Sequence, residues 1–462
     1  MYPAAGLRSG RAGDCTMAKL ARRLGVGDAA LIVMGGIIGS GIFRNPSVVA
    51  QRVPEPALIL GVWALGGFIA LLGGFVFAEL AARRPSDGGL YAYMRDAFHP
   101  VVAFMYGWTL LLVSQSGGAA ASAVTFAGYF PVVFGGVHVD AKWLAVGTLG
   151  FLTIVNCFGV RAGSNVQNLF MVLKIAAIGG LIAVGFAAAG SPAAQAAPAH
   201  AFGSTLDVLT AVGVAMIPVL FAYSGWQTSS FMTGELKQPA RTLPLGMIWG
   251  VAGVVVLYML VNIVCLRVLG TNGLMHTATP ASDVLRAVMG PRGAQLIAAA
   301  VMLSTFGFMS NQILTSPRVY HAMAQDGIFF KPVAWVHPST RVPVIAIALQ
   351  GIFAIVIALS GQYDQILNYV TSVDYVFFGL SAIALFVFRA RDARLAPAQA
   401  PQFRVPGHPV STALFMLVAF AVVLDTYVKY PQNSLIGLAI LLAGIPAYYL
   451  FLARRRPAEG LP

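Results

Sequence analysis

Charged residues are scarce in this sequence, and their scarcity excludes an ordinary water-soluble domain. Only 10% of the 462 residues are Asp, Glu, Lys or Arg, whereas 58% are hydrophobic. Soluble domains carry about 25% charged residues, because their surfaces face water. Hydrophobic runs of about 20 residues recur along the chain, and a run of that length crosses a bilayer as a helix. The composition therefore predicts an all-α integral membrane protein in a lipid bilayer.

Cysteine is nearly absent and histidine is scattered, which argues against a disulfide framework, a metal site or a catalytic centre. The three cysteines, Cys15, Cys157 and Cys265, have no paired spacing. The seven histidines lie in loops or at the ends of hydrophobic runs, and none forms a ligand pair at helical spacing. An enzyme would need a convergent set of nucleophile, base or metal ligands. We therefore expect no metal, no cofactor and no enzymatic activity.

Acidic residues are fewer than basic ones, 16 against 29, which gives a formal net charge of +13. The basic residues do not form one patch, as a nucleic-acid binder would require, but lie at alternate ends of the hydrophobic runs. Because cytoplasmic loops are enriched in Lys and Arg, this pattern places both termini in the cytoplasm. We expect a multi-pass protein of the cell inner membrane that binds no nucleic acid. The residues on the cytoplasmic side include Arg22, Arg83, Arg95, Arg318, Arg389 and Arg454.

The hydrophobic runs predict twelve transmembrane helices. Between spans two and three, a short run at 88–95 predicts an interfacial helix, and a second short helix is expected near 280–288. Residues 1–23 are expected to be a disordered cytoplasmic extension, and 454–462 a cytoplasmic tail. The predicted spans are 27–52, 56–82, 100–133, 142–160, 163–189, 204–235, 242–269, 291–324, 343–361, 365–389, 409–428 and 432–453.

Spans one and six carry the signals of interrupted helices. Span one holds four glycines within seven residues, Gly35 to Gly41, and each glycine costs a helix about 1 kcal/mol relative to alanine. Span six holds Pro218 and then the run 221–226. Interrupted helices at corresponding positions of two halves are typical of inverted-repeat transporters. We predict repeats at 24–190 and 204–390, with two further helices at 408–453.

At these positions the chain resembles the amino acid–polyamine–organocation superfamily, and within it the L-type amino acid transporter family. The resemblance covers residues 24–455 in segment order and spacing. It implies a leucine-transporter-type 5+5 inverted repeat and alternating access. Its motifs are Gly39-Ser40-Gly41-Ile42-Phe43, Phe77-Ala78-Glu79-Leu80, Gly88-Gly89-Leu90-Tyr91-Ala92-Tyr93, Phe221-Ala222-Tyr223-Ser224-Gly225-Trp226 and Glu235-Leu236-Lys237.

A broken helix offers free N–H groups at one end and free carbonyls at the other, which suit the carboxylate and the ammonium of an amino acid. By resemblance, the backbone N–H groups of Ser40 and Gly41 and the Ser40 hydroxyl hold the carboxylate, and the carbonyls of Ile37, Phe221 and Ser224 hold the ammonium. Gly39 and Ala222 belong to the same substrate-binding segments. Phe221 also serves as a gate toward the outside.

Lys174 lies deep inside span five, where a cation is costly and marks a functional site. Sodium-coupled relatives hold a sodium ion between spans one, five and eight, and in this family a lysine can take that place. Two interpretations stay open: a fixed charge in a sodium-independent exchanger, or a proton carrier in a symporter. Asp374 in span ten is a second candidate for proton handling or for pairing with a cation.

The walls of the expected pocket are small and polar at 114–118 and 228–230, which favours small neutral L-amino acids. Animal members use a cysteine between spans three and four to bind a heavy subunit, and residues 134–140 have none, so we expect no disulfide-linked heavy subunit. Arg44 departs from the family pattern, and its role stays open. A membrane sensor on the same fold is a remote alternative.

Overall fold

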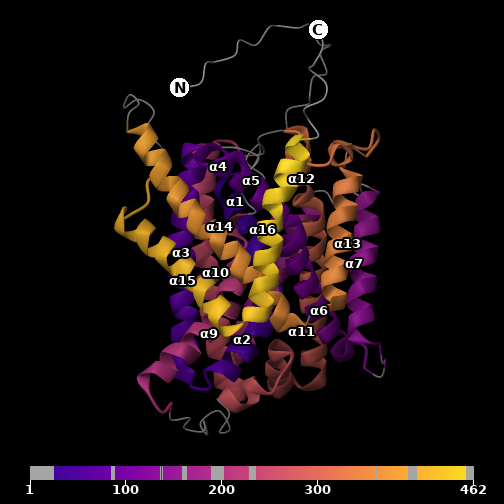
Figure 1. The fold of residues 1–462 in the computed structure, drawn as a ribbon. Coiled ribbons are helices and arrows are strands. Elements are labelled where there is room, and N and C mark those ends of the chain that lie inside the picture. The colour runs from indigo at the N-terminus through magenta and orange to yellow at the C-terminus, as the bar shows by residue number, and fades with distance from the viewer. Residues whose placement is uncertain are drawn as a thin grey trace, which may run out of the picture.

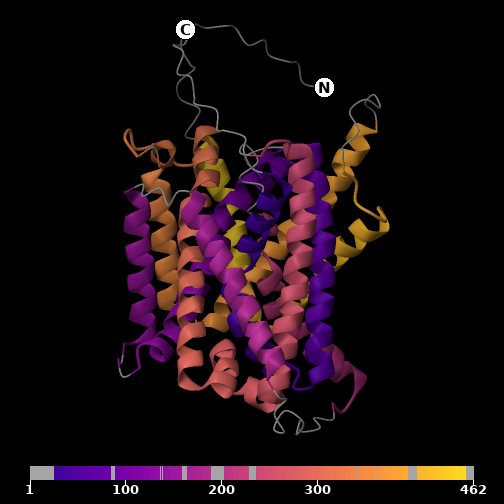
Figure 2. The same cartoon turned by 180° about the vertical axis from the view of Figure 1, so that it is seen from behind.

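The structure is a computed structural model that describes residues 25–84, 89–135, 137, 139–158, 164–188, 202–227, 236–340, 342–360, 362–393 and 403–453. Every regular element within these residues is a helix, and the helices stand side by side as one bundle (Figures 1 and 2). Helix α16 runs up to the end of the bundle at which α1 lies, whereas α2 lies toward the opposite end (Figure 1). The predicted N-terminal extension and C-terminal tail fall outside the described residues.

The first half of the chain forms helices over the residues predicted as spans one to five, and a short helix between the second and third of these segments. Span three has a π-helical turn, Leu110–Ser114, inside it. The bounds are α1 Val26–Ile37, α2 Gly41–Arg52, α3 Pro56–Arg83, α4 Gly89–Ala97, α5 Pro100–Thr109, α6 Gln115–Val133, α7 Ala141–Cys157 and α8 Ser164–Ala187.

The second half forms the remaining helices. Helix α11 contains the short helix expected near 280–288, because Gly290 has a φ of 72° and interrupts it there. The bounds are α9 Thr205–Tyr223, α10 Pro239–Met275, α11 Pro280–Thr315, α12 Pro317–Gln325, α13 Val344–Ser360, α14 Tyr363–Asp392, α15 Val410–Lys429 and α16 Pro431–Ala453, with a 3-10 turn at Lys331–Ala334.

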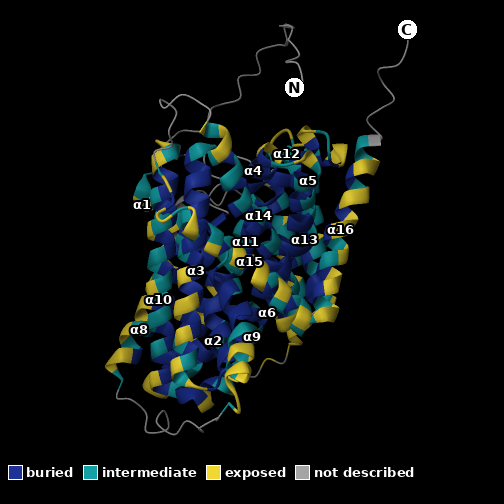
Figure 3. Cartoon of the chain, turned by 60° about the vertical axis from the view of Figure 1, so that its left-hand side comes forward, coloured by how far each residue is buried: buried dark blue, intermediate teal, exposed yellow. Residues whose placement is uncertain are grey.

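Among the described residues, eight helices are long and apolar enough to cross a membrane, and the bent pair α1–α2 makes a ninth. Three shorter apolar helices are Ala141–Cys157, Met171–Ala187 and Val344–Ser360. Large apolar side chains such as Trp143, Phe151 and Trp249 are exposed on the outside of the bundle. Figure 3 shows this exposure as yellow patches along outer helices, around a buried interior. An exposed apolar exterior suits a lipid environment, and the predicted all-α membrane protein is confirmed.

Helices from the two halves of the chain pack against one another in pairs. Helix α3 packs on α10, α6 on α11, α7 on α13, and α2 on α9. In each of these pairs, the two members stand five spans apart in the predicted order. This packing brings the broken helix α1–α2 against the end of α9, where the candidate site lies.

Candidate functional site

The first span is broken between Ile37 and Gly41. The two pieces, α1 and α2, meet at an angle of 47°. Ile38 leaves the helical conformation, with ψ at 85°, and the N–H of Gly39 turns back to the carbonyl of Ile37 at 2.8 Å. Because the first N–H groups of a helix have no acceptor within it, the start of α2 at Gly41 presents hydrogen-bond donors. The N–H of Phe43 already donates to the carbonyl of Ser40 at 3.2 Å.

The second break follows α9, which ends at Tyr223. Ser224 is extended, with φ −72° and ψ 162°, and Gly225 has a φ of 118°, which only glycine adopts readily. The Ser224 hydroxyl donates to the carbonyl of Phe221 at 2.7 Å. The rest of predicted span six, 228–235, lies outside the described residues, together with Glu235.

The two breaks approach so closely that glycine is required at each. A Cβ atom on Gly41 would lie 2.7 Å from the Cα of Ala222, and one on Gly225 would lie 2.2 Å from the carbonyl oxygen of Gly36. The Tyr258 hydroxyl of α10 lies 3.3 Å from the carbonyl oxygens of both Ile37 and Ala222. Helix ends from both halves of the chain therefore meet at one point.

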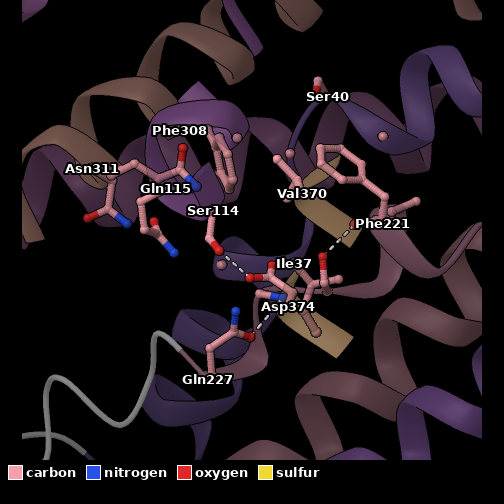
Figure 4. A pocket seen from close by; sticks show the side chains of 18 of the residues that line it. Ile37, Ser40, Ser114, Gln115, Phe221, Gln227, Phe308, Asn311, Val370 and Asp374 are labelled. Atoms are coloured by element: carbon pink, nitrogen blue, oxygen red, sulfur yellow. Dashed lines mark hydrogen bonds between the residues drawn. The ribbon is translucent and has the colours of Figure 1, made fainter. Parts of the chain in front are cut away.

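A cavity of about 630 Å³, including the part that is open to solvent, lies against both breaks. It is lined by the predicted residues Ile37, Gly39, Ser40, Gly41, Phe221, Ala222, Ser224 and Asp374. Figure 4 shows Ser40 on one side of this cavity, and Asp374 beside Ser114 on another. Ser40 also accepts a hydrogen bond from the Ser122 hydroxyl of α6 at 3.5 Å.

Lys174 is buried in α8, with 5% of its surface exposed. Its Nζ donates to the carbonyl of Ile38 at 2.5 Å and lies 5.5 Å from the centre of the Phe308 ring of α11. It therefore sits between the unwound part of span one and span eight. No ion pair joins Lys174 to an acidic side chain in the part of the chain that the structure describes. Lys174 is not among the residues that line the cavity.

The wall opposite the breaks comes from α6, α11 and α14. Asp374 of α14 accepts a short hydrogen bond from the Ser114 hydroxyl. Ser114 is the last residue of the π-helical turn. A π-turn inserts a residue into a helix and rotates the residues after it, and such turns are frequent at functional sites. Sequence inspection did not predict this turn, because its residues Leu110–Ser114 read as ordinary apolar helix.

Four residues of α11 also line the cavity and were missed from the sequence. They are Phe308, Asn311, Gln312 and Thr315. The last three follow Phe308 by three, four and seven residues, so all four lie on one face of a helix. The polar residues Asn311, Gln312 and Thr315 on one face of a hydrophobic run were the signal that the sequence offered.

The predicted small-residue walls are only partly placed. Ser114, Gln115 and Gly118 line the cavity. Ser116 instead donates to the carbonyl of Leu111, and a Cβ on Gly117 would meet Val370. Residues 228–230 lie outside the described part of the chain.

The end of the cavity beside α2 is sealed by polar contacts between the two halves. Asn45 donates to the carbonyl of Pro218 at 2.6 Å and accepts from the Tyr363 hydroxyl at 2.9 Å. The guanidinium of Arg44 lies 4.6 Å above the ring of the same Tyr363. Arg52 donates to the carbonyl of Val214 at 2.8 Å. In a regular helix this carbonyl would accept from residue 218, but Pro218 has no N–H to donate. Arg44 thus belongs to this seal and does not line the cavity.

Near the opposite end of the bundle, Glu79 is fully buried and fastens α3 to α14. Its carboxylate accepts from Arg389 at 2.6 and 2.8 Å, from Arg83 at 2.7 Å, and from the N–H of Val405 at 2.6 Å. Glu79 therefore joins α3 to α14 through ion pairs with Arg83 and Arg389. Just beyond α14, burial together with the nearby Arg389 lowers the pKa of His408.

Residues 24–445 match the family model for the amino acid permease. The chain belongs to this family. The resemblance predicted from the sequence is therefore confirmed. An amino acid permease is a multi-pass membrane transporter and not an enzyme, as the residues had predicted.

Named relatives of this permease include amino acid exchangers and transporters. It is 28% identical to the serine/threonine exchanger SteT of Bacillus subtilis (strain 168) over 435 residues, 93% of this chain and 97% of that protein. It is 29% identical to the b(0,+)-type amino acid transporter 1 of Mus musculus, over 94% of this chain and 88% of that protein. It is also 29% identical to the large neutral amino acids transporter small subunit 2 of Homo sapiens, over 93% and 80%.

Proposed function

We propose that this permease is a sodium-independent exchanger of small neutral L-amino acids that works by alternating access. The observation that carries the proposal is the cavity between the two helix breaks, with a buried lysine tied to the first break. The likeness to a serine/threonine exchanger over nearly the full length of both chains supports the exchange mode and a small substrate.

In this account the head group of the amino acid binds at the two breaks. The carboxylate lies at the N-terminus of α2, where the free N–H groups of Gly41 and its neighbours and the positive end of the helix dipole attract it. The ammonium lies at the carbonyls of Ile37, Phe221 and Ser224, which end the opposing helices. Phe221, which lines the cavity and is half-buried, covers the substrate as a gate.

Lys174 would act as a fixed cation in the place of a sodium ion. Its ammonium donates to the carbonyl of Ile38, the kind of oxygen ligand that a sodium ion would use, and it faces span eight through Phe308. With this place filled by a covalently attached charge, transport needs no sodium. Exchange then follows, because no ion binds to the carrier without substrate and returns its site to the other side of the membrane.

The proposed architecture is twelve spans with both termini in the cytoplasm and repeats at 24–190 and 204–390. The three shorter apolar helices would complete the count beside the eight long helices and the bent pair. The packing of α3 on α10 and of α6 on α11 supports the repeat, because an inverted repeat places such counterparts together around its axis. We expect the carrier to act without a disulfide-linked heavy subunit.

A proton-coupled symporter is the second candidate, favoured by the burial of Lys174 without an acidic partner among the described residues. In that case Lys174 would gain and lose a proton in each cycle. Asp374, which lines the cavity, is the other candidate for proton handling.

Uptake of labelled serine and alanine into proteoliposomes in sodium-free buffer separates these candidates. Vesicles are either empty or loaded with unlabelled serine, each with and without an inward proton gradient. An exchanger takes up label only into loaded vesicles and ignores the gradient. Gradient-driven uptake into empty vesicles would establish the symporter instead, and a strict need for sodium would contradict both.

A further inference from the structure

We propose that Asp374, Ser114 and Gln312 form a subsite for a protonated amine on the substrate side chain, so that the carrier also accepts short L-diamino acids. This inference rests on the proposed function, because it assumes that the amino acid head group binds at the two breaks. It names a substrate class that the small-residue walls alone do not predict.

The cavity has two chemically different sides. The side made by α2, by the end of α1 and by the end of α9 presents backbone N–H and carbonyl groups. The other side, from α6, α11 and α14, presents side chains (Figure 4). If the head group binds to the backbone side, the substrate side chain must point toward this second wall.

Two acceptors on the second wall lack enough donors. Asp374 accepts from the Ser114 hydroxyl, and no ion pair joins its carboxylate to a basic side chain in the described residues. The amide oxygen Oε1 of Gln312 is buried and has no hydrogen-bond donor among them. A buried acceptor such as this Gln312 oxygen is costly until a donor reaches it.

An ammonium group fits these acceptors better than a hydroxyl group does. An ammonium supplies three donors and a positive charge, whereas a hydroxyl supplies one donor and no charge. Hydrogen bonds between charged groups are about twice as strong as those between neutral groups. In its ionised form, the carboxyl group of Asp374 therefore matches a substrate with one positive charge on its side chain.

The close packing of this wall restricts the length of the side chain. A Cβ on Gly118 would already lie 3.0 Å from the amide nitrogen Nε2 of Gln312, so the amide fills the space beside α6. The aromatic ring of Phe308 packs against Gly39, because a Cβ placed on Gly39 would lie 3.1 Å from it. The ring therefore limits the space near Ser40 and Gly39. Short diamino acids should therefore bind better than lysine or arginine.

The test compares two competitors of nearly equal shape. L-2,4-diaminobutyrate carries an ammonium where L-norvaline carries a methyl group, and each is added at increasing concentration during exchange of labelled alanine. In the wild type, we expect diaminobutyrate to inhibit at least as strongly as norvaline. In Asp374→Asn, the ratio of the two inhibition constants should shift against diaminobutyrate by at least about tenfold, the loss expected for one charged hydrogen bond.

Two further measurements keep the test decisive if Asp374→Asn transports poorly. The rise in melting temperature of the purified variant is recorded with each compound, which needs no transport. Ser116→Ala is the control, because Ser116 donates to the carbonyl of Leu111 and does not line the cavity, so this variant should keep the wild-type preference. An unchanged ratio in Asp374→Asn, or a wild type that ignores diaminobutyrate, would overturn the subsite.

The outcomes separate this inference from the proposed function. If the wild type exchanges alanine and diaminobutyrate does not compete, only the subsite is wrong. If the wild type exchanges no amino acid, the proposed function is wrong. The melting shifts with diaminobutyrate and norvaline then decide whether the amine is still bound.

Discussion

The ammonium of Lys174 donates to the carbonyl of Ile38 at 2.5 Å and so ties α8 to the unwound part of span one. The carbonyl belongs to the three residues that separate α1 from α2, where the regular helical hydrogen bonding is interrupted. A side chain of α8 therefore supplies a hydrogen-bond donor to the break.

Replacing Lys174 by alanine should slow exchange. The variant leaves the Ile38 carbonyl without its charged donor, and hydrogen bonds to charged groups contribute about 1.5–3 kcal/mol. We expect the exchange rate to fall by roughly ten- to a hundredfold. The measurement is the initial rate of serine exchange, with Lys142→Ala, an exposed lysine at the start of α7, as the control. Wild-type rates in Lys174→Ala would remove Lys174 from the mechanism.

Replacing Phe221 by alanine should weaken closure over the substrate. The ring lines the cavity beside the second break, and its removal opens a space that water can enter. We expect KM to rise by roughly tenfold, since the burial of one aromatic side chain contributes a few kcal/mol at most. Phe158→Ala, an exposed ring after α7, should leave KM unchanged. Equal KM values in the two variants would argue against the gate.

The breaks could be predicted from the sequence, but their limits could not. Four glycines between Gly35 and Gly41 predicted an interruption, yet α1 continues through Gly35 and Gly36 to Ile37. These two glycines instead allow close packing: a Cβ on Gly35 would lie 1.9 Å from the methyl group of Met171, and Gly36 faces Gly225. A glycine that permits packing and one that permits unwinding look the same in a sequence.

The cavity wall opposite the breaks was harder to predict, because it joins residues far apart in the chain. The contact between Ser114 and Asp374 spans 260 positions, and that between Asn45 and Tyr363 spans 318. Asp374 could be singled out because it is an acidic residue inside an apolar span. Such a residue is energetically costly in a membrane and therefore indicates a functional site. Its partner depends on the rotation that the π-turn gives to span three.

Replacing Asn45 by alanine should open the seal beside α2. The variant leaves the Pro218 carbonyl without the Asn45 donor, at a cost of about 1–3 kcal/mol in the sealed state. It also removes the Asn45 acceptor of the Tyr363 hydroxyl, which keeps its hydrogen bonds with Ser40 and Thr125. In a variant without native cysteines that carries Ser122→Cys, we expect a thiol reagent added from that side to react several-fold faster. Tyr363→Phe removes one of the two bonds and should give an intermediate rate. Equal rates in all three proteins would contradict the seal.

Replacing Glu79 by glutamine should destabilise the fold rather than alter substrate binding. Glu79 is fully buried among Arg389, Arg83 and the N–H of Val405. Removing its charge takes the counter-ion from Arg389, whereas Arg83 keeps its ion pair with Asp392. Breaking a buried ion pair costs about 3–5 kcal/mol. The melting temperature of the purified protein should fall, while Glu55→Gln, at an exposed site, should leave it unchanged.

The central claim is that an amino acid binds between the two broken helices without sodium, and equilibrium binding tests it most directly. Labelled serine is titrated onto purified protein in sodium-free buffer, for the wild type, Gly41→Ala and Gly61→Ala. A Cβ on Gly41 would meet the backbone of Ala222 at 2.7 Å, whereas one on Gly61 meets nothing within 4 Å. The account predicts saturable binding by the wild type and Gly61→Ala, and its loss in Gly41→Ala. Binding that requires sodium, or that survives unchanged in Gly41→Ala, would contradict it.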